Sequence, residues 1–364
     1  MKRTSSFMPS IPLLICSLLF ILIGIITIAT ASTPFAISKG FSPNYYLIHQ
    51  VLFGFLPGII LGIIAFLTPL KFIKKSSLIL FIISMILMFS VFIPGIGINE
   101  GGASRWINIL GFSFQPSEFL KLTSILYLGA IFSNEKGKQN LTNFIVVLVL
   151  IASAFLFQKD LSTFVAIFAV CVAILLTTKT KLKGIVFTLL GGGAFIALMI
   201  LLFPYRMQRM TTLFNPSEGV TGEAYQINQS LISIGSGGLN GSGLGLSAQK
   251  LGFVPEAMSD SIFTIYAEEL GFLGCAFLIF LFIFFIIYSV NLAKKADPFG
   301  KFLTIGIVTW IVIQSAINIF AMSGFFPVTG IPLPFLSYGG THLVFELIAL
   351  GILLNISRTV NNNE

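Results

Sequence analysis

Long uninterrupted apolar runs, separated by short polar stretches, dominate this chain of 364 residues. A membrane-spanning helix needs roughly 20 consecutive apolar residues, and about ten runs approach or exceed that length. Only 9% of the residues are charged and 56% are hydrophobic, which excludes an ordinary soluble domain. We therefore predict an all-α, polytopic membrane protein of about ten transmembrane helices, forming a single domain over residues 1–364. The predicted spans are 11–31, 47–69, 76–97, 117–133, 142–158, 161–178, 184–204, 261–292, 302–324 and 340–357.

Two of these runs allow more than one interpretation. Run 11–31 follows a basic N-terminus, as in a secretory signal, but a signal core has roughly 7 to 15 residues, so a first spanning helix is favoured. Run 261–292 is long enough to tilt or to begin outside the hydrocarbon, and we interpret it as one helix. The three cysteines lie inside apolar runs, where no redox or metal role is expected.

The basic residues are distributed unequally between alternate connections. With the N-terminus in the cytoplasm, 14 of the 21 Lys and Arg residues fall on the cytoplasmic side. Because Lys and Arg accumulate in cytoplasmic loops, we predict that both termini are cytoplasmic. This distribution explains the net charge of +8, and no basic segment has the interleaved aromatics of a nucleic-acid module. No nucleic-acid partner is expected.

Two outer connections are long, 98–116 and 205–260, and the second separates the seventh predicted helix from the eighth. Long ordered loops often carry function, so we expect the chemistry on the outer face. Asp260 closes the second connection, directly before an apolar helix. An Asp at this position either caps the helix or acts in catalysis, and the pattern alone leaves both open. Glu268 and Glu269 follow within the helix, where polar contacts between helices are favoured over catalysis.

A second group of polar residues lies around the first long connection. Trp106 fits an interfacial anchor, the common role of Trp near lipid headgroups. Pro116 and Glu118 resemble a helix start. Lys121 would lie one turn inside a span, where its ammonium group needs a carboxylate, a carbonyl or an anionic ligand.

Two further segments are rich in glycine. Run 234–245 lacks the spacing of a nucleotide-binding loop, so it either packs tightly against backbone or offers its N–H groups to a phosphate. Run 329–341 contains two prolines and three glycines and cannot be a regular helix throughout. We expect a re-entrant or groove-lining turn there.

Together these segments resemble the SEDS family (shape, elongation, division and sporulation), from about residue 45 to the end of the chain. The matching strings are GASRWI, QPSEFLKL, YQINQSLISIGSGGL, GLGLSAQKLGFVPEA followed by Asp260, AEELGF and TGIPLPFLSYGGT. The strings GLGLSAQK and GILLNISR are most similar to the branch that contains FtsW and SpoVE.

The resemblance implies a peptidoglycan glycosyltransferase that polymerises lipid II at the outer face of the bacterial cytoplasmic membrane, in cell division or a related septal process. It implies work beside a class B penicillin-binding protein and other division or elongation proteins. The family's essential acid maps onto Asp260, which favours catalysis there. A divalent cation, Mg or Mn, is a candidate cofactor. The candidate headgroup and pyrophosphate contacts are Lys121, Arg105, Arg206, Arg209, Lys250, Trp106, Gln115, Glu118, Gln229, Ser337 and Tyr338, with Glu256, Glu268 and Glu269 as polar support.

Three departures from the family pattern concern substrate contacts more than the fold. The usual HTDF is Met258-Ser259-Asp260-Ser261, the usual QPDxGT is Gln158-Lys159-Asp160-Leu161-Ser162-Thr163, and His49 stands where Arg often precedes the Gln of the second helix. Two other functions stay open. A lipid II flippase or other transporter would use ionisable groups at membrane depth, such as Glu268, Glu269 and Glu346. A non-catalytic scaffold would recruit a cell-wall synthase.

Overall fold

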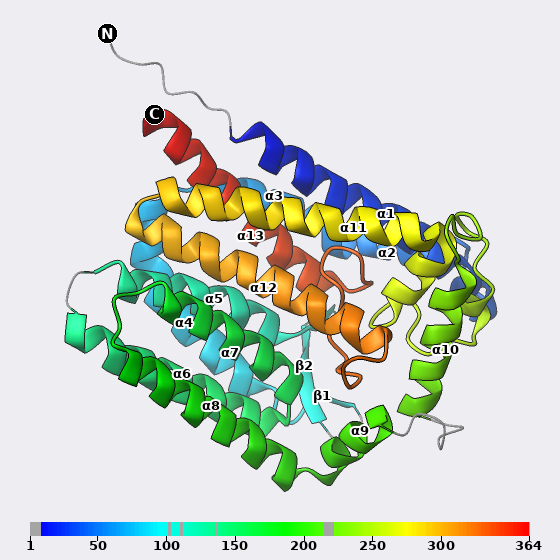
Figure 1. Ribbon diagram of the computed structural model, residues 1–364, viewed down its shortest axis with the longest axis horizontal. Helices are drawn as coiled ribbons and strands as arrows, with labels where there is room; N and C mark the ends of the chain where they lie inside the picture. The colour runs from blue at the N-terminus through cyan, green and yellow to red at the C-terminus, as the bar shows by residue number, and fades with distance from the viewer. Residues whose placement is uncertain (1–8, 101–102, 110–111, 135–136, 215–221, 364) are drawn as a thin grey trace.

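The computed structural model describes residues 9–100, 103–109, 112–134, 137–214 and 222–363. Gly102 of the GASRWI string and residues 215–221 of the second outer connection lie outside this part. Long helices lie side by side in a bundle, and the start of α1 and the end of α13 lie at the same end of it (Figure 1). The opposite end carries β1, β2, α9 and α10, and we call it the loop end.

Within the described residues, eight helical segments are long and apolar enough to cross a membrane. Two more predicted spans, 117–133 and 161–178, correspond to α5 and α7, which are shorter and packed among the others. The eight are α1 (Ile11–Ser38), α2 to α3 with a π-helical turn between them (Tyr45–Leu67), α4 (Leu70–Ser90), α6 (Gly137–Gln158), α8 (Leu182–Leu202), α11 (Ile262–Lys295), α12 (Pro298–Met322) and α13 (Gly340–Asn363). The shorter two are α5 (Pro116–Phe132) and α7 (Leu161–Leu176).

Helix starts near the loop end follow local sequence rules. Pro116 occupies the first turn of α5, where its missing N–H leaves no bond unmade. Asp160 caps α7 by accepting from the backbone N–H and the hydroxyl of Thr163. Both helices therefore begin at fixed positions beside the loop end.

The interpretation of 261–292 as one regular helix is wrong at Gly271. Gly271 has φ 62° and ψ −162°, so α11 is broken there. The glycine-rich segment 237–243 bonds to both sides of the break: Gly238 and Leu239 accept from Phe272 and Leu273, while Ser242 and Gly243 donate to the carbonyls of Glu268 and Glu269. The glycine-rich run therefore packs against backbone, the first of its two predicted roles.

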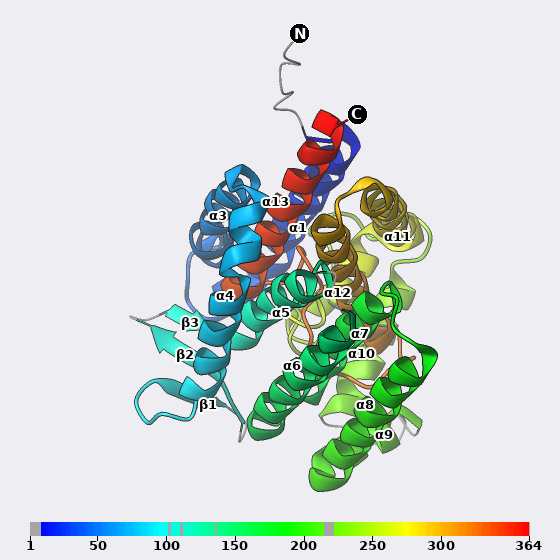
Figure 2. The ribbon, with the colours of Figure 1, turned by 90° about the vertical axis from the view of Figure 1, so that its left-hand side faces the viewer.

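The outer connections contain structure that the apolar pattern did not predict. Three strands form an antiparallel sheet in the order β1 (Gly97–Glu100), β2 (Ala103–Ile109) and β3 (Phe112–Phe114). The sheet lies beyond the end of α4, at one side of the bundle (Figure 2). The second connection contains α9 (Pro204–Phe214), α10 (Glu223–Ser236) and a 3-10 turn at Gln249–Leu251.

Candidate functional site

The segment that carries Asp260 is bonded along its backbone to the last outer loop. The backbone N–H of Tyr338 donates to the carbonyl of Met258 at 2.7 Å, and the Ser337 hydroxyl donates to the carbonyl of Ser259 at 2.7 Å. The Asn318 amide donates to the carbonyl of Asp260 at 2.7 Å. Loop 323–339 and α12 thus hold Asp260 in place.

The carboxyl of Asp260 is not a helix cap. Ser261 occupies the N-cap position of α11, and no side chain caps the helix. Within the described part of the chain, the Asp260 carboxyl makes no hydrogen bond or ion pair. It lies beside Gly330, since a Cβ on that glycine would be 3.4 Å from Asp260 Oδ2. The capping role left open by the sequence is therefore not found.

The electrostatic surroundings of Asp260 raise its pKa to about 7. Burial is the largest cause, and the nearby carboxylate of Glu256 adds to it, while Arg209 opposes both. Glu256 itself has a left-handed backbone with φ 51° and accepts from the Ser259 hydroxyl at 2.7 Å. A carboxyl with a pKa near neutral pH can take a proton and give it up again, as a general base must.

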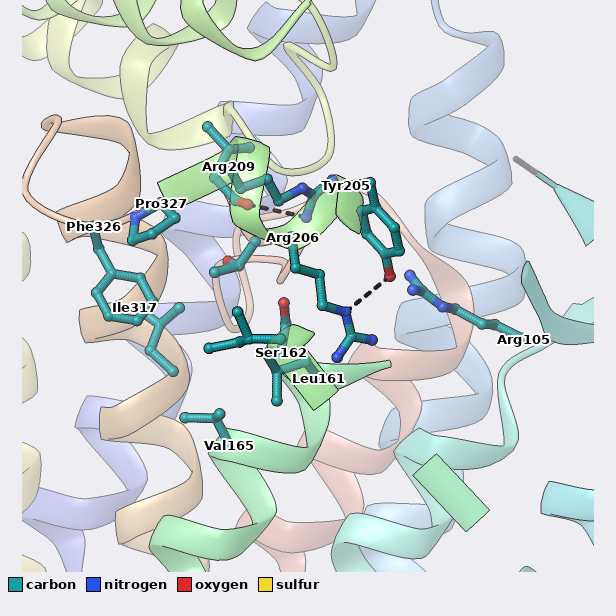
Figure 3. A pocket seen from close by; sticks show the side chains of 13 residues that line it. Arg105, Leu161, Ser162, Val165, Tyr205, Arg206, Arg209, Ile317, Phe326 and Pro327 are labelled. Atoms are coloured by element: carbon teal, nitrogen blue, oxygen red, sulfur yellow. Dashed lines mark hydrogen bonds between the residues drawn. The ribbon is translucent and has the colours of Figure 1, made fainter. Parts of the chain in front are cut away.

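Beside this segment lies a cavity of about 100 Å³, which we call the arginine cavity (Figure 3). Its polar wall comes from Arg105 of β2, Ser162 at the start of α7, and Tyr205, Arg206 and Arg209 of α9. Its other wall is largely apolar. The lining is Arg105, Leu161, Ser162, Val165, Ile200, Tyr205, Arg206, Arg209, Ile317, Phe326, Pro327, Val328 and Thr329.

Arg206 is the most unusual residue of the arginine cavity. Its side chain is buried and reaches from α9 towards Leu161 and Ser162, and its Nε donates to the Tyr205 hydroxyl at 3.1 Å (Figure 3). Neither Nη1 nor Nη2 has a hydrogen-bond partner among the described residues. Arg209, in contrast, donates to the carbonyl of Val328 and pairs with Glu223. A buried guanidinium with free donors is suited to an anionic ligand.

A second, smaller cavity of about 30 Å³ adjoins the first, with Arg105 and Thr329 lining both. In this lysine cavity, Lys121 Nζ lies 2.7 Å from a Glu118 carboxylate oxygen and donates to Gln314 Oε1 at 2.7 Å. Glu118 is thus the carboxylate partner that Lys121 was expected to need. The lining is Arg105, Gln115, Glu118, Lys121, Asp160, Thr163, Ala166, Gln314, Thr329, Gly330, Ile331 and Pro332.

The carbonyl of Lys159 joins the walls of the two cavities. Arg105 Nη2 donates to it at 2.8 Å and the Tyr205 hydroxyl donates at 3.2 Å, so β2 and α9 meet at the turn between α6 and α7. Lys159 itself is left-handed, with φ 53°. Arg105 Nε also lies 3.9 Å from Asp160. The segment that departs from the family's QPDxGT pattern therefore still organises the cationic wall.

Several predicted residues lie outside these two cavities. Lys250 is buried, with Nζ 2.7 Å from Glu269 and donating to the carbonyl of Thr30. Glu268 accepts from Ser233, Ser247 and the backbone N–H of Ala248. These residues tie the second outer connection to α1, α10 and α11.

Trp106, Gln229 and Tyr338 also lie away from the cavity linings. Trp106 is half-buried in β2 opposite Ile98, and Gln229 is half-buried in α10. Tyr338 shares a hydrogen bond with His49 at 2.8 Å. His49, the residue at the family's Arg position, thus contacts the same loop that holds Asp260.

Sequence reasoning missed the polar residues of α12. Trp310 and Lys121 both donate to Gln314 Oε1, and Gln314 Nε2 donates to the carbonyl of Pro332. Gln314 and Asn318 are spaced four residues apart inside an otherwise apolar run, so they share one face of the helix. That spacing is the signal that could have identified them.

The structure gives limited support for a metal site. Among the described residues, no group of three or more His, Cys, Asp or Glu side chains is placed to hold a metal ion. Asp260 and Glu256 interact electrostatically, and Mg²⁺ is often held by one or two carboxylates together with substrate phosphates. Glu256, which is exposed, is the carboxylate here that fits a cation arriving with a phosphate-bearing substrate.

Known proteins resemble this chain over nearly its whole length. Residues 11–362 match the family of cell cycle proteins that comprises FtsW, RodA and SpoVE. The chain is 40% identical to stage V sporulation protein E of Bacillus subtilis (strain 168), over 98% of each chain. It is 35% identical to the probable peptidoglycan glycosyltransferase FtsW of Trichlorobacter lovleyi, over 92% of this chain and 89% of that protein.

Solved structures share the fold. A chain from a peptidoglycan synthase complex that coordinates polymerization and crosslinking superposes with a TM-score of 0.77 at 19% identity, covering 96% of this chain and 98% of the other. The rod shape determining protein RodA of Thermus thermophilus gives a TM-score of 0.71 at 20% identity, over 96% and 97%. The predicted likeness to the FtsW and SpoVE branch is confirmed by the sequence relatives. The chain is an integral membrane protein and belongs to the FtsW, RodA and SpoVE family of cell cycle proteins, the SEDS family.

Proposed function

We propose that this protein is a peptidoglycan glycosyltransferase that polymerises lipid II into glycan strands, in cell division or a related septal process. The observation that carries the proposal is the carboxyl of Asp260, which has no hydrogen-bond or ion-pair partner in the described part of the chain and a pKa near 7, held beside two cation-lined cavities. The printed name of the FtsW relative supports the same reaction.

Asp260 acts as the general base. It removes the proton from a sugar hydroxyl of the acceptor lipid II as that oxygen attacks the anomeric carbon of the growing chain. The new bond joins the acceptor oxygen to the anomeric carbon, and the bond from that carbon to the pyrophosphate oxygen breaks. Attack opposite the leaving group inverts the anomeric centre. One carboxylate suffices because pyrophosphate leaves as an anion without needing a proton, unlike the leaving group in glycoside hydrolysis.

The arginine cavity receives the charge of the leaving group. Arg206 and Arg209 supply guanidinium donors, and those of Arg206 are already desolvated, so they do not have to be stripped of water during the reaction. A cavity of about 100 Å³ has room for a phosphate group but not for a disaccharide. The sugars therefore lie over the cavity, towards Asp260. The prenyl tail follows the membrane-facing surface of the bundle.

Glu256 would hold a divalent cation together with the substrate's phosphate oxygens, which leaves the Asp260 carboxyl free to act as the base. When bound, the cation neutralises negative charge on the pyrophosphate. Glu256 is exposed, and it lies close enough to Asp260 to raise the pKa of that carboxyl.

The proposed location is the bacterial cytoplasmic membrane, with the loop end on the extracytoplasmic side. The distribution of Lys and Arg supports this orientation, because the cytoplasmic connections hold 14 of the 21 basic residues. The proposed partners are a class B penicillin-binding protein and other division or elongation proteins, with membrane lipid around the helices. The synthase complex that contains a chain of the same fold supports a complex of this kind.

The proposed function is tested by separating polymerisation from transport. The protein is purified in detergent with and without its co-encoded penicillin-binding protein and supplied with lipid II, and the products are resolved by gel. In parallel, the same preparation is reconstituted into liposomes and lipid II movement is measured. Glycan polymer from the assembled pair is the expected result. Lipid II movement across the liposome membrane without polymer would replace the glycosyltransferase with a transporter.

A further inference from the structure

Glu346 is a buried carboxylate of α13 that the proposed mechanism does not use. Its side chain is 0% exposed, and its Oε2 accepts from the backbone N–H of Phe335 at 2.8 Å. Its Oε1 has no hydrogen-bond partner among the described residues. An ionisable group at membrane depth is costly and commonly has a functional reason. Among the described residues, the hydrogen bond of Glu346 is therefore with the loop that precedes α13.

Phe335 has a backbone conformation that needs support. Its φ is 66°, in the left-handed region that bulky residues rarely adopt. Its ring stacks on Phe20 of α1 with centroids 5.0 Å apart. Its carbonyl lies against Gly24, where a Cβ would come within 2.1 Å of the oxygen. Glu346, Phe20 and Gly24 therefore hold Phe335 at its N–H, its ring and its carbonyl.

The turn around Phe335 is connected directly to the segment of Asp260. The Ser337 hydroxyl accepts from the N–H of Leu333 at 2.7 Å and donates to the carbonyl of Ser259 at 2.7 Å. The next residue, Tyr338, donates its N–H to the carbonyl of Met258. A shift of Phe335 would move Ser337 and Tyr338, and with them the peptide that precedes Asp260.

We propose that Glu346 is a positioning residue for Asp260, which acts by holding Phe335 and thereby the turn that bonds to Met258 and Ser259. The proposal rests on the proposed function, because it takes Asp260 as the base. Glu346 itself does not touch substrate. Its carboxylate fixes the distance between the base and the acceptor sugar.

Two properties of Glu346, its reach and its ability to ionise, have to be separated. Glu118 and Lys121 both interact electrostatically with Glu346, so a variant that cannot ionise also removes any coupling to the lysine cavity. Glu346→Gln keeps the length and an acceptor oxygen but cannot ionise. Glu346→Asp keeps the carboxyl group but shortens the side chain by one methylene, which withdraws the acceptor from Phe335. If the position of the acceptor oxygen matters, only Glu346→Asp lowers the rate of polymerisation.

The kinetic expectation follows from the position of the base. In Glu346→Asp, kcat for lipid II polymerisation falls by about 10- to 100-fold, because small displacements of a catalytic group have effects of that size. The KM for lipid II changes by less than about twofold, since the cationic residues of both cavities remain in place. Glu346→Gln keeps kcat within about threefold of the native value. Asp297→Ala serves as the control. It removes the carboxylate that caps the first turn of α12, at the end of that helix away from Asn318, and it keeps native kinetics.

Two readouts distinguish positioning from a loss of general stability. In Glu346→Asp, looser packing lets water reach Asp260, so the pKa of Asp260 falls and the acidic limb of the pH profile of kcat moves to lower pH. The charged neighbours of Asp260, Glu256 and Arg209, are unchanged in this variant. Hydrogen–deuterium exchange of peptides covering 331–338 and 256–260 becomes faster in the same variant. Neither change is expected in Glu346→Gln or Asp297→Ala.

The experiments separate failure of the positioning role of Glu346 from failure of the proposed function. Slower turnover and faster local exchange in Glu346→Asp, with native behaviour in Glu346→Gln, support the proposal. Native turnover in Glu346→Asp overturns it, as does equal impairment of Glu346→Gln, which would make the ionisable carboxyl group, and not its reach, the cause. Failure of the proposed function appears elsewhere, as full activity of Asp260→Asn.

Discussion

The side-chain amide of Asn318 donates to the main-chain carbonyl of Asp260 at 2.7 Å and to that of Ile331 at 2.8 Å. One buried residue of α12 therefore holds the segment of Asp260 and the last outer loop at a fixed separation. Gln314, one turn earlier, donates to Pro332 of the same loop and accepts from Lys121. A rigid helix thus sets the position of Asp260 relative to both cavities.

The pH dependence of polymerisation follows from the surroundings of Asp260. A base must be ionised, so activity rises with pH through about 7, the pKa to which burial and Glu256 raise it. Glu256→Gln removes the carboxylate that contributes to this elevation, so the acidic limb of kcat/KM moves to lower pH. Asp297→Asn, at the opposite end of α12, serves as control. An unmoved limb in Glu256→Gln would show that another group titrates.

Arg206→Met separates function from stability. Because Nη1 and Nη2 have no partner in the described structure, removal of the charge leaves the melting temperature unchanged or raises it. Loss of charged hydrogen bonds to the pyrophosphate lowers kcat/KM by about 10- to 100-fold, corresponding to roughly 1.5–3 kcal/mol. Arg358→Met is the control. Arg206 lies over the ring of Phe203, and Arg358 likewise lies over the ring of Phe66, but Arg358 is on the C-terminal helix α13. A lower melting temperature with unchanged kcat/KM would make Arg206 structural.

The buried pair of Lys250 and Glu269 is predicted to stabilise the attachment of the second outer connection to α11. Lys250→Met leaves the Glu269 carboxylate buried and uncompensated, which lowers the free energy of unfolding by about 3–5 kcal/mol. The double variant Lys250→Met with Glu269→Leu removes both charges and recovers most of the loss. Thermal unfolding in detergent measures the stability of the single and the double variant. A double variant as unstable as Lys250→Met alone would refute the pairing.

Gly271→Ala tests the break in α11. A Cβ there would lie 2.3 Å from the backbone N of Gly241, and φ 62° is strained for Ala, so the glycine-rich segment is displaced and the melting temperature falls. Gly191→Ala in α8 is the control, because its Cβ meets nothing within 4 Å. That substitution is neutral or stabilises by up to about 1 kcal/mol. Similar melting temperatures for the two variants would mean that the break tolerates a side chain.

The sequence predicted those features that depend on local pattern. Apolar runs identified the helices, and Pro116 marked the start of α5, because length and turn chemistry are local properties. The strands at 97–114 were not predicted, since they are short and lack regular alternation. The break at Gly271 was missed because its partner, the segment 237–243, is bonded to it mainly through backbone groups, which leave no pattern in the sequence.

The sequence predicted only part of the candidate site, because the rest of the site depends on contacts between segments that are distant in the sequence. Asp260 was identified through its motif, but its neighbours Asn318 and Gly330 come from segments more than 50 residues away. Lys250 and Arg206 have the same kind of charge and belong to one outer connection. Only the folded chain distinguishes Lys250, which pairs with Glu269, from Arg206, whose Nη1 and Nη2 have no hydrogen-bond partner among the described residues.

The central claim is that Asp260 is the catalytic base. The most direct measurement is lipid II polymerisation by the purified protein, assembled with the proposed partner, a class B penicillin-binding protein. It is made for the native chain and for Asp260→Asn, with complex assembly checked by size-exclusion chromatography. The account predicts that the substitution, which keeps the size of the side chain and removes the base, lowers the rate by at least about 100-fold in an intact complex. Polymerisation at the native rate by Asp260→Asn would contradict it.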